Sequence, residues 1–103
     1  MAHFLHDHEG RKIRLTDERL EHIQNHPEMR GRLADISRVL ANPERVVEST
    51  SDHEARLYYR YFFDTVVGDK YLCVVAKIRP NDSFVLTAYF TDTIKGGPRL
   101  WPK

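Results

Sequence analysis

The sequence has a single cysteine, Cys73, and almost no net charge. One cysteine excludes a disulfide framework within the chain and a cysteine-rich zinc site. The 16 lysines and arginines nearly balance the 15 aspartates and glutamates, so the net charge is +1. This balance excludes a polybasic nucleic-acid-binding arm and an acidic tail. No apolar run approaches the roughly 20 residues that a membrane-spanning helix needs.

The 103 residues are 41% hydrophobic and 11% aromatic, which is enough for one modest core. This length is too short for a large metabolic enzyme or a Rossmann cofactor-binding domain. A small hydrolytic enzyme and a binding module both remain compatible with the composition. The first ten residues are rich in histidine and acidic residues and lack the apolar centre of a secretory signal. We therefore expect a cytoplasmic protein with no membrane segment.

The first half of the chain predicts two helices. Thr16 and Asp17 are typical helix-start residues, and this helix should end or bend before Pro27. Apolar residues at helical spacing predict a second helix that stops at Asn42-Pro43; they are Leu33, Ile36, Val39 and Leu40. Residues 1–12 leave two alternatives, a flexible segment or one half of a small hairpin formed by 3–6 and 12–15.

The second half predicts strands. Residues 45–49, 56–64, 70–79 and 83–91 are rich in Val, Tyr, Phe and Thr. Tight turns separate the last three segments, and such short links do not allow parallel crossovers. We therefore predict one α+β domain over residues 1–103, with two N-terminal helices packed on one face of a four-stranded antiparallel sheet. Residues 95–103 are expected to form an irregular tail.

Alternation along the strands predicts which side chains the helices leave uncovered. In residues 56–64 the more apolar face should pack on the helices; its side chains are Leu57, Tyr59, Tyr61 and Phe63. The opposite set brings Arg60, Lys77, Thr87 and Tyr89 together on the uncovered face. Further candidates for binding RNA are Arg56, Tyr58, Tyr71 and Arg79.

Cations that bind phosphate, placed among tyrosines that stack on unpaired bases, suit single-stranded RNA. The alternative is an ordinary solvated sheet face, where the same residue types are common. The assignment depends on strand register, because a slip of one residue exchanges the two faces.

His22 and His26 are four residues apart on the first predicted helix. This spacing can hold a metal, but Glu-His-Ile-Gln-Asn-His lacks the glutamate that follows the first histidine in zinc proteases. No cysteine completes a site, so no metal or other cofactor is expected. Histidine is also a natural proton shuttle near neutral pH. The alternative is structural, with His22 at the surface and His26 capping the end of the helix.

Several segments in this order resemble phage-type members of the barnase–EndoU–colicin–RelE superfamily of small RNases. The resemblance lies in 16–23, His26-Pro27-Glu28-Met29, 40–43, Leu57-Tyr58-Tyr59-Arg60, 71–77 and 84–91, and it spans roughly residues 13–101. It implies a RelE/barnase-like fold and a metal-independent endoribonuclease. In such enzymes the ribose 2′-OH attacks the adjacent phosphorus and leaves a 2′,3′-cyclic phosphate.

The resemblance also implies roles for single residues. His22 matches the helix-borne histidine of the family and is the first candidate for proton transfer, with His26 as the second. Thr87 and Tyr89 match the Thr-x-Tyr of the final strand, where the hydroxyl of Thr87 would contact phosphate. Tyr89 would stack on a base or share the acid–base work.

Arg60 and Lys77 would hold the phosphate and stabilise its developing negative charge. The resemblance implies RNA, either tRNA or mRNA, as the partner. It also implies a toxin of a toxin–antitoxin or phage-related system, with a cognate antitoxin protein as a second partner. Toxic relatives are often strongly basic, whereas this chain is nearly neutral, so RNA affinity has to come from a local patch. The alternative function is a non-catalytic RNA- or protein-binding module on the same fold.

Overall fold

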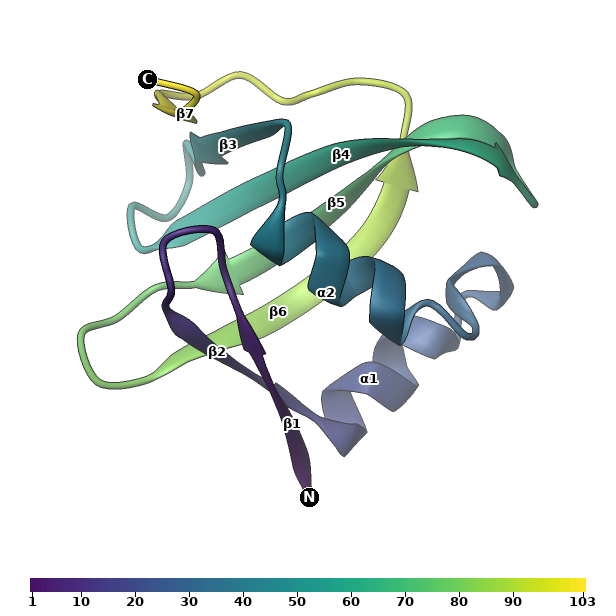
Figure 1. Ribbon diagram of the computed structural model, residues 1–103, viewed down its shortest axis with the longest axis horizontal. Coiled ribbons are helices and arrows are strands. Elements are labelled where there is room, and N and C mark those ends of the chain that lie inside the picture. Colours follow the sequence, from purple (N-terminus) through teal and green to yellow (C-terminus); the bar gives the residue numbers. More distant parts are fainter.

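The computed structural model describes residues 1–103 and contains seven strands, two α-helices and one short 3-10 helix (Figure 1). The elements are β1 (Ala2–His6), β2 (Lys12–Thr16), α1 (Asp17–Gln24), η1 (Pro27–Met29), α2 (Leu33–Ala41), β3 (Arg45–Glu48), β4 (Ala55–Thr65), β5 (Gly68–Lys77), β6 (Ser83–Thr91) and β7 (Arg99–Trp101). The two predicted helices are confirmed. Neither is long and apolar enough to cross a membrane.

All seven strands form one mixed sheet in the order β1-β2-β6-β5-β4-β3-β7. The predicted antiparallel meander of β3 to β6 is confirmed, but the prediction of a four-stranded antiparallel sheet is wrong. The N-terminal hairpin extends the meander through parallel pairing of β2 with β6, and β7 pairs with β3. Both ends of the chain thus cover a sheet edge whose N–H and C=O groups would otherwise lack partners.

The same finding bears on two smaller predictions. Of the two alternatives for residues 1–12, the hairpin is confirmed, because β1 pairs with β2 over Ala2–His6 and Lys12–Thr16. Residues 95–103 are not wholly irregular, because they include β7.

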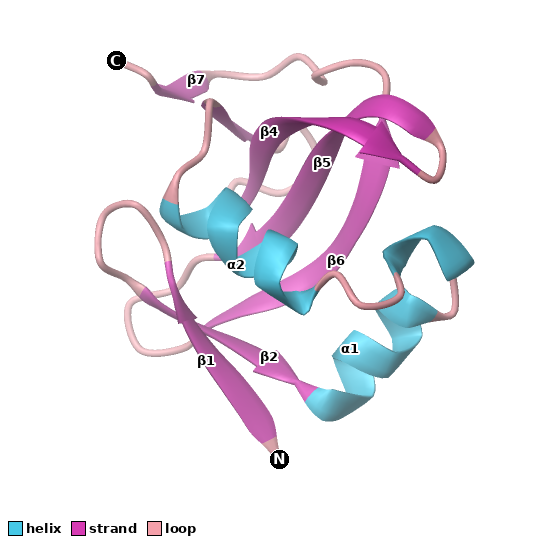
Figure 2. Cartoon of the chain, turned by 45° about the vertical axis from the view of Figure 1, so that its right-hand side comes forward, coloured by secondary structure: helices cyan, strands magenta, loops and turns pink.

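Both α-helices lie on one face of the sheet (Figure 2). The Thr16 hydroxyl accepts the Arg19 N–H at 3.1 Å and caps α1, while Asp17 and Glu18 place negative charge at the positive end of the helix dipole. The apolar side of α2 packs into the main core through Ile36, Val39 and Leu40. On the sheet side, this core contains Ile13, Leu15, Val46, Tyr58, Leu72, Val74, Ala76, Val85 and Ala88.

The pairing of β4 reverses the faces that alternation predicted for this strand. Tyr58 pairs with Val74 and belongs to the main core, and Arg60 pairs with Leu72 on the same side. Tyr59 pairs with Cys73 and points to the opposite face. The prediction was wrong because the helix side accommodates both arginines of this strand. Arg56 reaches Glu9 of the β1–β2 turn and Arg60 reaches the Asn42 carbonyl oxygen, while the more apolar set packs into a separate core on the opposite face.

β6 contains an irregularity that alternation alone does not reveal. The register between β5 and β6 shifts between Val75 and Ala76, which is typical of a β-bulge. As a result Val85 turns toward the helices, and Phe84 pairs with Lys77 on the other face. Strict alternation along residues 83–91 predicts that Phe84, Ala88 and Phe90 face the helices. This is confirmed for Ala88 and Phe90 and wrong for Phe84.

The face opposite the helices, which we call the helix-free face, has a small core of its own. Val47, Leu57, Tyr59 and Cys73 are buried there. The segment between β6 and β7 contacts this core, and its Lys95 N–H donates to the Tyr59 hydroxyl at 3.1 Å. At Gly97 an added Cβ would collide with the carbonyl oxygen of Glu48, so the close approach of the segment to β3 requires glycine.

Candidate functional site

The helix-free face has a pocket of about 250 Å³ between two loops. Its floor consists of side chains from three strands, namely Leu57, Val75, Thr87 and Tyr89. Residues 49–51 form one wall, and Lys95 with Gly96 forms the other. Thr87 and Tyr89, two of the residues that the sequence predicted as a site, therefore do lie together in one concave surface.

The polar groups in this pocket are hydroxyls and one ammonium. Burial raises the pKa of Tyr89, so its phenol stays protonated at neutral pH and acts as a hydrogen-bond donor. The Lys95 ammonium lies 5.9 Å from the centre of the Tyr89 ring, within range of a cation–π interaction. Together they offer proton donors and a positive charge to an anion above the floor.

The two titratable groups beneath the pocket, Tyr59 and Cys73, are unreactive at neutral pH. Burial raises the pKa of the Cys73 thiol to about 11 and that of Tyr59 to about 12. Both side chains are fully buried and uncharged at neutral pH. Cys73 is thus a packing residue rather than a nucleophile, because the thiolate is the reactive form.

Lys77 borders the pocket on the same face, two residues beyond Val75 on β5. Its ammonium lies 2.6 Å from Asp52 Oδ2 and 3.6 Å from Glu54 Oε1. The hydrogen bond from Lys77 lowers the pKa of Asp52, which keeps that carboxylate ionised. Lys77 is therefore correctly placed on the helix-free face, but acidic neighbours already balance its charge.

Aromatic rings extend from the pocket toward the β4–β5 turn. Tyr71 is T-shaped to Tyr59 with centroids 6.2 Å apart, and Tyr61 lies 4.9 Å from Tyr71. Phe63 follows at 5.1 Å from Tyr61 and is 72% exposed. Tyr71, predicted from the sequence to bind RNA, is thus part of a row of rings that unpaired bases can stack on.

Arg60 does not lie on this face. It points to the helix side, where its Nη1 donates to the Asn42 carbonyl oxygen at 2.8 Å. Asn42 is the C-cap of α2, so the guanidinium caps the negative end of that helix. The expectation that Arg60 shares one surface with Lys77 and Tyr89 is therefore wrong.

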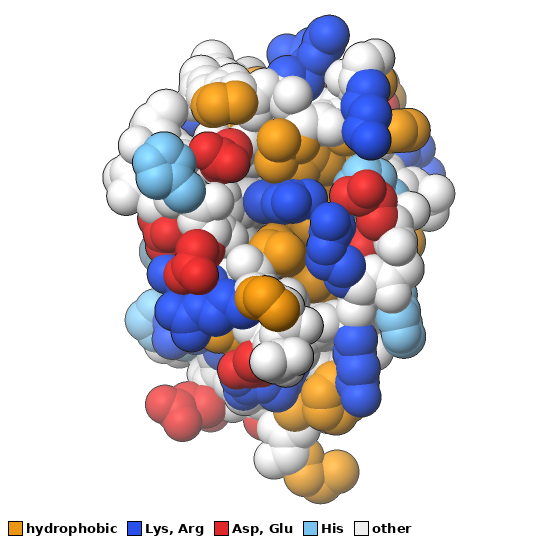
Figure 3. Space-filling model, turned by 90° about the vertical axis from the view of Figure 1, so that its left-hand side faces the viewer, with side chains coloured by type: hydrophobic (Ala, Val, Ile, Leu, Met, Phe, Trp, Pro, Cys, Tyr) orange, Lys and Arg blue, Asp and Glu red, His pale blue; other side chains and the backbone are white.

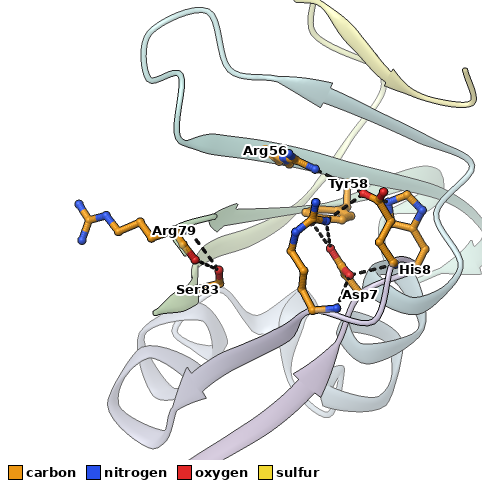
Figure 4. Close-up of polar contacts among 8 residues, drawn as sticks. Asp7, His8, Arg56, Tyr58, Arg79 and Ser83 are labelled. Atoms are coloured by element: carbon orange, nitrogen blue, oxygen red, sulfur yellow. Dashed lines mark hydrogen bonds and ion pairs between the residues drawn. The ribbon is translucent and has the colours of Figure 1, made fainter. Parts of the chain in front are cut away.

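Tyr58 and Arg56 also face the helix side, where they meet the β1–β2 turn (Figure 4). The fully buried Tyr58 donates its hydroxyl hydrogen to Asp7 Oδ2 at 2.9 Å. Arg56 lies 3.6 Å from Glu9. Burial of Tyr58, together with the nearby Asp7 charge, raises the pKa of its phenol. Neither residue is positioned to stack on or contact RNA on the helix-free face.

Asp7, His8 and Glu9 bring their ligand atoms within 4.8 Å of one another, a spacing that can suit a metal ion. However, Asp7 already accepts hydrogen bonds from Tyr58, from the Arg11 side chain and from two backbone N–H groups. Arg11 and Arg56 lie beside Glu9 as well. The guanidinium groups of Arg11 and Arg56 already neutralise these carboxylates, so we interpret the cluster as a structural element that stabilises the β1–β2 turn.

His22 and His26 are exposed near the end of α1. His22 lines a separate hollow of about 480 Å³ with Thr16, Glu18, Arg19, Glu21 and Asn25. His26 occupies the N-cap position of η1 without a side-chain hydrogen bond there. Neither histidine lines the pocket of Thr87 and Tyr89.

Sequence reasoning missed the walls of the pocket. Ser49, Ser51 and Lys95 come from loops, which carry no periodicity that shows where they fold. It also assigned no role in RNA chemistry to His53, which follows the wall residues 49–51 and is almost fully exposed. A hydrogen bond to Glu48, at 3.0 Å, raises the pKa of His53.

No family model matches this chain, and neither the curated proteins nor the solved structures contain a match. We therefore infer function from the chemistry of the helix-free face.

Proposed function

We propose that the protein is a metal-independent endoribonuclease that holds single-stranded RNA on the helix-free face. The observation that carries the proposal is the pocket that unites Thr87, Tyr89 and the Lys95 ammonium beside a row of aromatic rings. The order of sequence segments that resembles the barnase–EndoU–colicin–RelE superfamily points to the same chemistry.

In the proposed reaction the ribose 2′-OH attacks the neighbouring phosphorus. The bond from phosphorus to the 5′ oxygen breaks, and a 2′,3′-cyclic phosphate remains. Lys95 is positioned to stabilise the added negative charge on the phosphorane, and Thr87 to hydrogen-bond a phosphate oxygen. The phenol of Tyr89 supplies a proton to the leaving 5′ oxygen, which is far more basic than a phenolate.

The base that removes the 2′ proton is assigned to His53 rather than His22. His53 belongs to the loop whose residues 49–51 wall the pocket, whereas His22 faces a different hollow. The neighbouring Glu48 carboxylate also orients the imidazole and stabilises the imidazolium that forms on proton uptake. This assignment is tested by comparing the two histidines directly.

The test is cleavage of tRNA and total RNA by the purified protein in EDTA, with detection of 2′,3′-cyclic phosphate ends. The variants Lys95→Ala, Tyr89→Phe and His53→Ala should each lose about 10²- to 10⁴-fold in rate. Matched controls are His22→Ala and Arg60→Ala, which should keep the wild-type rate. Intact RNA with the wild type, or loss of activity in the controls alone, would overturn the proposal.

A second candidate function is RNA binding without cleavage. It is favoured by the pairing of Lys77 with Asp52 and Glu54, which leaves Lys95 as the one cation lining the pocket without a carboxylate partner. This function predicts saturable binding of single-stranded RNA without new RNA ends, and weaker binding by Tyr71→Ala.

A further inference from the structure

A second and larger cavity, of about 570 Å³, lies where the N-terminal hairpin meets the β5–β6 turn. Its lining is Phe4, Arg11, Lys12, Arg14, Ile78, Arg79, Pro80, Asn81, Asp82 and Ser83. Figure 3 shows the side of the molecule that carries the left-hand loops of Figure 1, where Lys and Arg side chains gather among Asp and Glu. The volume is within the range of cavities that bind small molecules or parts of larger ones.

The charge of this cavity differs from that of the whole chain. Four of its lining residues are cationic and one, Asp82, is acidic, whereas the chain as a whole has a net charge of +1. Arg14 is bound by Asp82 at 3.1 Å, and Arg11 by Asp7 and Glu9, each at 2.9 Å. Lys12 has no carboxylate partner, and Arg79 meets Glu54 through its Nε atom alone, at 3.3 Å, so these two residues are the ones that can accept an external anion.

Arg79 is held in place without its terminal nitrogens being used. Its backbone N–H donates to the Ser83 hydroxyl, and that hydroxyl donates back to the Arg79 carbonyl, both at 3.1 Å. The Nε atom donates to Glu54 at 3.3 Å, and the guanidinium lies 5.8 Å from the Phe84 ring. Figure 4 shows this guanidinium pointing away from the Asp7 cluster. Both terminal nitrogens are thus free to donate to a phosphate.

Lys12 is oriented by an aromatic ring instead of a carboxylate. Its ammonium lies 4.2 Å from the centre of the Phe4 ring. No acidic side chain approaches it within ion-pair distance, although 13 such pairs form elsewhere in the protein. A cation that is positioned but unpaired is suited to an anion from outside the protein.

The cavity and the smaller pocket lie along one line that follows β5 and continues to Arg79, two residues after the strand ends. Val75 lines the pocket, Lys77 follows on the same face, and Arg79 lines the cavity. Four residues of extended chain span about 13 Å. Arg14 and Phe84, which pair at the edge of β2 and β6, lie on the same side of the sheet.

We infer that the larger cavity binds a backbone phosphate of the RNA strand whose cleavage site lies in the smaller pocket. This inference rests on the proposed function and adds a subsite to it. The ligand class is a phosphodiester on single-stranded RNA, bound by Lys12 and Arg79. An exposed, positively charged cavity also supplies the local patch that a nearly neutral chain needs to hold RNA.

The test measures binding of a short fluorescent single-stranded RNA, 2′-O-methylated to prevent cleavage, over a range of salt concentrations. Lys12→Ala/Arg79→Ala should bind about tenfold or more weakly than the wild type. The slope of log K against log salt should fall by about 0.7, which is the contribution of one phosphate contact on a single strand. Arg30→Ala/Lys103→Ala removes the same residue types from exposed positions outside the cavity and should bind as the wild type does.

Two outcomes would overturn the inference while leaving the proposed function intact. One is a double variant that binds RNA with the wild-type affinity and salt slope. The other is a double variant that loses affinity for inorganic phosphate or a 5′-mononucleotide but not for the RNA, which would make the cavity a site for small phosphates. Wild-type protein that neither binds nor cleaves RNA would instead overturn the proposed function itself.

Discussion

Tyr58 and Tyr59 are neighbours on β4, both fully buried, yet they belong to different regions of the molecule. The Tyr58 hydroxyl donates a hydrogen bond to the buried Asp7, within a cluster whose polar groups are already paired with one another. The Tyr59 hydroxyl accepts the Lys95 N–H beside an open pocket. The comparison shows that equal burial of two side chains does not mean equal roles for the faces they occupy.

The two faces also differ in the size of their cores. Fourteen buried residues form the core under the helices, and four form the core of the helix-free face. Hydrophobic stabilisation grows with the apolar area that is buried. We therefore expect substitutions on the helix side to change mainly the free energy of unfolding. Substitutions on the helix-free face should change mainly the binding and cleavage of RNA.

The largest expected effect is that of Asp7→Ala, which removes the carboxylate from the closed cluster. It leaves the buried Tyr58 hydroxyl without its partner and Arg11 with Glu9 alone, and the loss of these hydrogen bonds to a buried carboxylate should cost about 3 kcal/mol. Urea unfolding of the variant checks this value. Tyr58→Phe removes one hydrogen bond and should cost about 1 kcal/mol. An Asp7→Ala variant as stable as the wild type would show that the cluster does not hold the turn.

The pH dependence of stability gives a second test of the role of the Asp7 carboxylate. Burial of Asp7 acts to raise its pKa, but hydrogen bonds from Arg11, Tyr58 and Glu9 outweigh burial and lower the pKa. Stability from this carboxylate is therefore present above its unfolded pKa of about 3.9 and is lost as the pH falls below that value. Asp7→Asn should show a smaller loss of stability between neutral and acidic pH than the wild type. Equal acid sensitivity of the two proteins would contradict this role.

Much of the helix side could be predicted from the sequence because its signals are local. The Thr16 cap and the apolar stripe of α2 each lie within one or two turns of helix. The parallel pairing of β2 with β6 joins segments about 70 residues apart and left no local signal. Alternation misled on the faces of β4 because Arg56 and Arg60 flank Tyr58 on the helix side, where they find polar partners that are distant in the sequence. The register shift beside Ala76 places Phe84 on the helix-free face, and alternation along β6 alone cannot reveal a shift in pairing with β5.

The helix-free face was predictable only in part. Thr87 and Tyr89 lie on a regular stretch of β6, so alternation placed them correctly. The loop residues Ser49 and Lys95 come to the pocket through tertiary contacts, and no pattern in their own segments shows this.

On the helix-free face we expect Gly97→Ala to disturb the pocket wall. The added methyl group collides with the Glu48 carbonyl, so the segment that carries Lys95 has to move. Stability should fall by about 1–2 kcal/mol, with a larger relative loss of RNA binding or cleavage. Gly31→Ala is the matched control, since Gly31 also has a positive φ, a Cβ there meets no atom within 4 Å, and the residue lies outside the pocket. Equal behaviour of the two variants would show that the wall does not depend on this close approach.

The smallest expected effect is that of Arg60→Ala. The lost contact is a cap on α2 through Asn42, so the free energy of unfolding should fall by about 0.5–1 kcal/mol. Thermal or urea unfolding measures the change. A loss well above this range would mean that Arg60 holds more of the helix side together than its single hydrogen bond indicates.

The most direct test compares the rate at which Lys95→Ala and Arg60→Ala form 2′,3′-cyclic phosphate ends on tRNA in EDTA. The two variants each remove one positive charge, from opposite faces of the same sheet. We predict that Lys95→Ala loses at least about 100-fold in rate and that Arg60→Ala keeps the wild-type rate. Loss of cleavage in Arg60→Ala with full activity in Lys95→Ala would contradict the assignment of RNA chemistry to the helix-free face.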